Sequence, residues 1–193
     1  MDTFNKEDVS SEMFRLLMLH IGDSSLCTKL IRADFMKKFR FEENRLNEDF
    51  ELILRMLNEV DGVYCVGEVH YNILVRAGSN QRGGFKPHLY EAMIDNSDLA
   101  FSIMESNFPQ FRTEAIRFRF FQRLDYLLHI PVEKMTNDNI YYKKIISDIR
   151  KENQLWKINP YLTAKEKRNL KILSICPKFS KRIHKIIMKL KGA

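Results

Sequence analysis

The chain has 193 residues, of which 45% are hydrophobic and only 7 are Gly and 5 are Pro. This composition excludes a disordered or fibrous chain and suffices for one domain of ordinary size. The cysteines Cys27, Cys65 and Cys176 lie too far apart for a CxxC-type zinc site, and their odd number does not fit a secreted disulfide framework. The N-terminal "MDTFNKEDVSSEMF" resembles neither a signal peptide nor a membrane span, so a cytoplasmic location is expected.

The net charge of +7 is concentrated near the C-terminus. Residues 165–193 contain ten Lys and Arg and the single acid Glu166, a net charge of +9, which leaves −2 for residues 1–164. An anionic partner is therefore expected to meet the C-terminal segment rather than the body of the protein.

The first 60 residues are predicted to be helical, because apolar side chains recur at intervals of three and four residues. The expected helices cover residues 10–19, 33–39 and 47–60. The third has the clearest apolar face, and Asn47 is its expected N-cap.

Two short β-branched runs, "VYCV" (63–66) and "EVHYNILVR" (68–76), are predicted to be strands, and the glycine-containing "AGSNQRGG" after them a loop. Two strands are too few for the sheet of an α/β enzyme and usually need neighbours. The chain is therefore expected to be one half of something larger, with the partner strands missing or supplied by another chain.

After Pro87 the helical pattern returns. The expected helices there cover residues 89–107, 109–128 and 138–156. Thr163 and Glu166 have the spacing of a capping box, and Pro177 stands where the first position of a further helix is expected. The predicted fold class is mainly α with a small β element, an α+β arrangement.

The stretch "SLCTKLIRADFMKKFRFEENRLNEDFELILRMLNEVDGVYCVGEVHYNILVRAGSNQR" resembles the acceptor-side half of family 2 glycosyltransferases of bacterial cell-surface polysaccharide synthesis. The likeness covers residues 26–82, under a third of the chain, and departs from the family at Cys27-Thr28, where Trp-Asn is common. The matching motifs, in order, are Lys29-Leu30 with Arg32, Phe41 with Glu43, Glu48-Asp49, Tyr71 with Arg76, and Ser79.

The resemblance implies the C-terminal part of a GT-A fold. In that family an N-terminal β/α half binds the nucleotide sugar and carries an Asp-x-Asp-type motif for a divalent metal, and no such motif precedes Lys29 here. The chain is therefore expected to lack the nucleotide-binding half and to be inactive in isolation. Mn or Mg is expected only in the full-length enzyme, with no metal site in this chain.

By the same resemblance, Asp49 is the base that takes the proton of the acceptor hydroxyl in an inverting transfer, and Glu48 bonds the acceptor or orients the loop. Without the resemblance, both acids are explained by the helix dipole, which favours negative charge in the first turn.

The resemblance also implies a substrate-binding group of Lys29, Tyr71, Arg76 and Ser79. Cations such as Lys29 and Arg76 are suited to the diphosphate of the donor, and Ser79 lies in a loop that is a candidate lid. The alternatives are solvated surface cations, a plain surface loop, and a core position for Tyr71.

The chain is expected to divide into residues 1–86, with the acceptor site and base, a helical region 87–160, and basic amphipathic helices 161–193. The last segment suits either an anionic membrane surface, at the inner face of the cytoplasmic membrane, or packing on the body with its lysines in solvent.

Two other functions are compatible with the sequence. A non-enzymatic helical adaptor at a membrane surface would need no chemistry from Asp49. A nucleic-acid binder would use the basic segment, but the body is nearly neutral and has no recognisable docking motif, so no nucleic-acid partner is expected.

Overall fold

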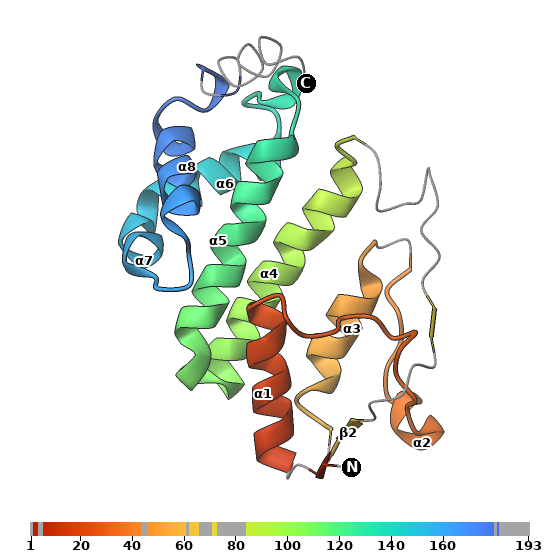
Figure 1. Cartoon of the computed structure of the whole chain (residues 1–193). Coiled ribbons are helices and arrows are strands. Elements are labelled where there is room, and N and C mark those ends of the chain that lie inside the picture. The colour runs from red at the N-terminus through yellow and green to blue at the C-terminus, as the bar shows by residue number, and fades with distance from the viewer. Residues whose placement is uncertain are drawn as a thin grey trace.

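A computed structural model describes residues 2–3, 6–43, 46–60, 62–65, 71–72, 84–179 and 181. Its fold is a set of packed helices (Figure 1). The elements are, in order, β1 (Asp2–Thr3), α1 (Lys6–Met18), α2 (Ala33–Met36), α3 (Glu48–Met56), β2 (Tyr64–Cys65), α4 (Pro87–Asn107), η1 (Pro109–Phe111), α5 (Arg112–His129), η2 (Val132–Lys134), α6 (Ile140–Lys151), α7 (Asn153–Ile158) and α8 (Ala164–Ile175).

The helical hairpin of α4 and α5 is the centre of the molecule. Helices α6, α7 and α8 pack on one side of it, and α1 and α3 on the other (Figure 1). A large hydrophobic cluster lies on each side, and α5 contributes to both of these, with Phe120 and Leu124 in one and Ala115 and Phe118 in the other. The hairpin therefore joins the two clusters into one folded unit.

A charged network crosses the centre of this unit. The guanidinium of Arg123 on α5 is fully buried and donates to Asp98 of α4 (2.7 Å) and Asp148 of α6 (2.7 Å). Arg119, one turn earlier, donates to Asp98 (2.9 Å) and pairs with Glu152. Burial alone would raise the pKa of Asp98, but Arg123 and the other cations around it lower that pKa to about 2. The network fixes α4, α5 and α6 against one another.

The predicted α+β class is wrong. Apart from helices, the regular structure of the described residues is one antiparallel ladder with two residues on each strand. Asp2 lies opposite Cys65, and Thr3 lies opposite Tyr64. So short a ladder has no face on which helices could pack, and the apolar faces of the helices are buried against one another instead. The expected C-terminal part of a GT-A fold fails for the same reason. Of the predicted strand 68–76, only residues 71–72 are described, and they form no strand.

Most of the predicted helices are confirmed, with shifted ends. The capping box is present, because Thr163 Oγ1 accepts from the Glu166 amide and the Glu166 carboxylate accepts from the Thr163 amide. The single helix expected over residues 138–156 is instead two, α6 and α7, separated at Glu152. Trp156 lies on the second of these, and its indole N–H donates to the carbonyl of Ile149 (2.9 Å).

In the part of the chain that the structure describes, no helix combines the length and the apolar character needed to cross a bilayer.

Candidate functional site

The site predicted from the sequence centres on the first turn of α3, which contains Glu48, Asp49 and Glu51. Asp49 binds a distant segment there, since its Oδ2 accepts from the backbone amide of Leu26 (3.2 Å). This bond holds the loop of residues 23–29, hereafter the Lys29 loop, against the head of α3. Asp49 is thus fixed by more than its own helix.

The Lys29 loop is ordered by its own polar groups. The carboxylate of Asp23 accepts from the Ser25 amide (2.9 Å) and from the Thr28 hydroxyl, which closes a tight turn. The Lys29 ammonium donates to the carbonyls of Asp23 (2.9 Å) and Ser25 (2.7 Å) and lies 3.3 Å from the Asp23 carboxylate. Lys29 therefore stabilises the loop that Asp49 anchors.

Asn47 precedes α3 in the left-handed region, with φ of 60°, which asparagine tolerates better than most residues. Asn47 is the N-cap residue of α3, as predicted, but its side chain makes no capping hydrogen bond. Instead its carbonyl accepts from Nδ2 of Asn96 on α4 (3.1 Å). Asn96 is fully buried, so the start of α3 is fixed to the central hairpin.

The three acids of this first turn have different surroundings. Glu51 is buried and lies 3.5 Å from Arg55 one turn later, where it serves packing. Glu48 and Asp49 are partly exposed. The two acids predicted for chemistry are therefore the ones that a ligand at this end of α3 can approach.

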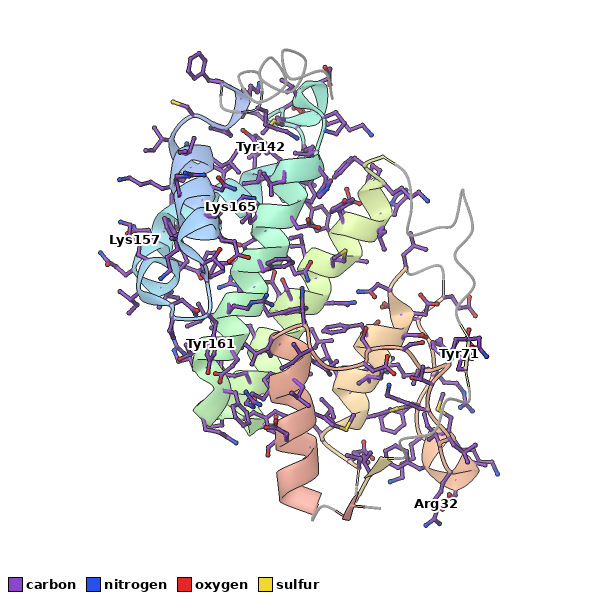
Figure 2. The ribbon with its side chains drawn as sticks, in the orientation of Figure 1. Arg32, Tyr71, Tyr142, Lys157, Tyr161 and Lys165 are labelled. Atoms are coloured by element: carbon purple, nitrogen blue, oxygen red, sulfur yellow. The ribbon has the colours of Figure 1, made fainter. Side chains whose placement is uncertain are left out.

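Tyr71 joins the same region. It lies at the edge of the molecule on the side of α3 (Figure 2), with half of its surface exposed. The neighbouring Cys27 side chain raises the pKa of Tyr71 above the ordinary value for tyrosine. Tyr71 is therefore near the Lys29 loop. Arg76 and Ser79, the other two predicted substrate-binding residues, lie outside the described residues.

Comparison with known proteins finds no relative of this chain. No family model, curated protein or solved structure matches the chain.

Sequence reasoning missed two residues that shape this site, Asp23 and Asn96. The stretch "GDSS" (22–25) carried a signal for the first, because an aspartate followed by serines is typical of a side-chain-closed turn. Nothing local in the sequence marks Asn96, whose partner Asn47 is 49 residues away.

Metal-ligating side chains do not gather among the residues described: no group of three His, Cys, Asp or Glu is placed to hold an ion.

The clearest hollows lie away from this site. A groove of about 420 Å³ lies between α6, α7 and α8, and a second of about 350 Å³ adjoins it on α7 and α8. Figure 1 shows these helices on the opposite side of the central hairpin from α3.

Proposed function

We propose that this chain is the acceptor-side portion of an inverting family 2 glycosyltransferase, which moves a sugar from a nucleotide-sugar donor to a glycan or lipid-linked acceptor. The observation that supports this most directly is the meeting of three separate motifs at one place. Asp49 bonds the Lys29 loop, and the Cys27 side chain of that loop lies beside Tyr71. These three of the motifs that resemble the family in order along the chain are thus neighbours in space.

In the proposed reaction the acceptor hydroxyl attacks the anomeric carbon of the donor sugar, and the bond to the nucleotide diphosphate breaks. The Asp49 carboxylate takes the proton of that hydroxyl as the new glycosidic bond forms. Its hydrogen bond to Leu26 fixes the orientation of the carboxylate, which general-base catalysis requires. Glu48, the neighbouring partly exposed acid, accepts a hydrogen bond from another acceptor hydroxyl.

The binding roles are proposed as follows. Tyr71, with its exposed ring, forms a wall for the acceptor. Lys29 keeps the loop in place and, with Arg76, adds positive charge near the leaving diphosphate. Ser79 belongs to the loop that closes over the donor. The donor and its Mn or Mg are assigned to a part of the full-length enzyme other than these 193 residues.

The test is the substitution Asp49→Asn in the source cells, read out as the amount of surface polysaccharide. Asparagine keeps an oxygen that can accept from Leu26, so the loop contact survives while the base is lost. Transfer is expected to fall by a factor of about 10²–10⁴, with normal abundance of the protein by immunoblot. Glu59→Gln is the matched control, since Glu59 is an exposed acid just after α3 that pairs with Lys38 (3.3 Å).

Unchanged polysaccharide in the Asp49→Asn strain would refute the catalytic role. That result would favour the second candidate function, a non-enzymatic adaptor at the inner face of the cytoplasmic membrane. The observation that supports the adaptor is the exposed apolar and basic surface of α8, which is independent of Asp49.

A further inference from the structure

Helix α8 has two distinct faces. Leu170 and Leu173 are buried against the body of the protein. At 100° per residue, Arg168, Ile172 and Ile175 lie on the opposite side of the helix. Ile175 is 64% exposed, and Phe179, just beyond the helix, is 66% exposed. The outward face is therefore apolar in part, although α8 is already packed on the protein.

The polar residues of this outward face are all cationic. Lys165, Arg168 and Lys171 are exposed on α8, and Lys178 follows next to Phe179. The single acid of the helix, Glu166, is used in the capping box with Thr163. No Asp or Glu occurs from residue 167 to residue 193. Nothing acidic on this face therefore neutralises its charge.

The 420 Å³ groove lies beside this face, between α8 and the helices α6 and α7. Its floor is apolar, made by Ile149 and Trp156, and its rim is cationic, made by Arg150, Lys157 and Lys171. The Arg150 guanidinium donates to the Ser174 carbonyl (2.7 Å), which fixes α6 to α8 at the rim. Lys157 lies over the Trp156 ring and points outward from α7 (Figure 2).

The rim cations have no acidic partner among the residues that the structure describes. Lys157 donates to the side-chain oxygen of Asn153 (2.8 Å), a neutral group. Neither Lys171 nor Arg150 is within ion-pair distance of a described carboxylate. The second groove, which adjoins this one, is lined by two further cations, Lys167 and Arg168. The groove thus offers several cations to one anionic group above an apolar floor.

We infer that the outward face of α8 and this groove together form a binding surface for an anionic phospholipid bilayer. Ile172, Ile175 and Phe179 enter the boundary between headgroups and acyl chains, and the flanking cations bind lipid phosphates, one of them in the groove. Charge complementarity selects an anionic partner, and the outward isoleucines select lipid over nucleic acid, because a phosphodiester backbone offers no apolar layer to receive them.

This inference does not rest on the proposed sugar transfer. It also differs from the expectation for the basic segment 161–193 as a whole, because it assigns binding to particular described residues and includes α6 and α7. Leu170 and Leu173 belong to the core and take no part.

The experiment is co-sedimentation of the full 193-residue chain with vesicles of phosphatidylcholine alone or with about 30% phosphatidylglycerol. Binding is expected only with phosphatidylglycerol present. The pair Ile175→Ser and Phe179→Ser is expected to weaken the partition coefficient about tenfold. The pair Lys157→Gln and Lys171→Gln is expected to weaken it about 25-fold, about fivefold for each lysine.

Matched control variants lie on the other side of the molecule. Leu30→Ser changes an apolar side chain that is fully exposed on the Lys29 side. Lys37→Gln with Lys38→Gln removes two exposed cations after α2. All of these substitutions are at exposed positions, so folding should be unchanged, which circular dichroism will show. The controls are expected to bind vesicles as the unaltered chain does.

Trp156 reports the groove directly, because it is the single tryptophan of the chain. Its emission is expected to change on addition of phosphatidylglycerol vesicles, and to change less in the double lysine variant. Equal binding to neutral vesicles, or unaltered binding by both the apolar and the lysine variant pairs, would overturn the inference. Binding of an oligonucleotide in preference to the anionic vesicles would overturn it as well and would identify nucleic acid as the partner.

Discussion

Arg123→Met should destabilise the protein strongly. Methionine fills much of the space of the arginine side chain but removes a charge that is completely buried between Asp98 and Asp148. Removal of one partner of a buried ion pair typically costs about 3–5 kcal/mol, because the other charge stays desolvated. Asp98 keeps Arg119 and Lys144, whereas Asp148 keeps only Arg119, at 3.7 Å, within the described network.

Because Asp98 and Asp148 keep these other cations, the expected loss in the free energy of unfolding is at the low end of that range, about 3 kcal/mol. For a chain of this length that corresponds to a fall in Tm of about 6–12 °C. Urea unfolding followed by circular dichroism measures the first quantity and thermal unfolding the second. Lys144→Met is the control, with a cost under about 1 kcal/mol because its ammonium is exposed.

A loss below about 1 kcal/mol for Arg123→Met would refute the role assigned to this network. A second measurement tests it through pH. Asp98 has a pKa of about 2 in the folded protein, below that of an unfolded aspartate near 3.8. Its stabilising contribution is therefore complete above pH 3.8 and is lost as the pH falls from 3.8 toward 2. Asp98→Asn should flatten the stability profile in that window.

Three further outcomes are expected. Thr163→Ala removes the capping box of α8 and should cost about 1 kcal/mol in urea unfolding, whereas Thr163→Ser should cost little. The His20 ring is buried between Phe118 and Phe121, and this burial, with a smaller effect of the Arg117 charge, lowers the pKa of His20 to about 4. The stability that depends on neutral His20 is therefore complete above pH 6.5 and is lost as the pH falls from 6.5 through 4. His20→Gln should remove this pH dependence from urea midpoints measured across that range. Asp49→Ala should cost about 1–2 kcal/mol by loss of the acceptor for the Leu26 amide, and Asp49→Asn about 0.5 kcal/mol; equal losses would exclude the loop-anchoring role.

The helices could be predicted from local patterns, and their tertiary partners could not. Apolar spacing and Pro87 marked α4, and the Thr163-Glu166 pair marked α8, because these signals act within a few residues. The buried charges were missed. The helix expected over residues 109–128 gave no sign that Arg123 is buried, because its acidic partners come from α4 and α6, each 25 residues away in sequence.

The predicted strands failed for a related reason. A β-branched run such as 63–66 has the composition of a strand, but a strand forms only where another edge is available to pair with it. Here the described partner is Asp2–Thr3, so the pairing ends after two residues.

For the candidate site, motif order predicted Asp49, Lys29 and Tyr71, and the structure places these three near one another. It did not identify the way they meet. The contact depends on the backbone amide of Leu26, on Cys27 and on the turn closed by Asp23, none of which the motif pattern marks as functional. Backbone donors are invisible to sequence patterns because every residue except proline has one.

The position of α5 in both hydrophobic clusters has a consequence for measuring ligands. The head of α3 belongs to one cluster and Trp156 to the other, and α5 forms the common wall. A molecule that binds only the folded state at α3 must therefore stabilise both clusters together, since neither keeps its packing without that wall. The fluorescence of one distant indole would then report, as a shifted unfolding midpoint, a ligand at α3 that never touches it.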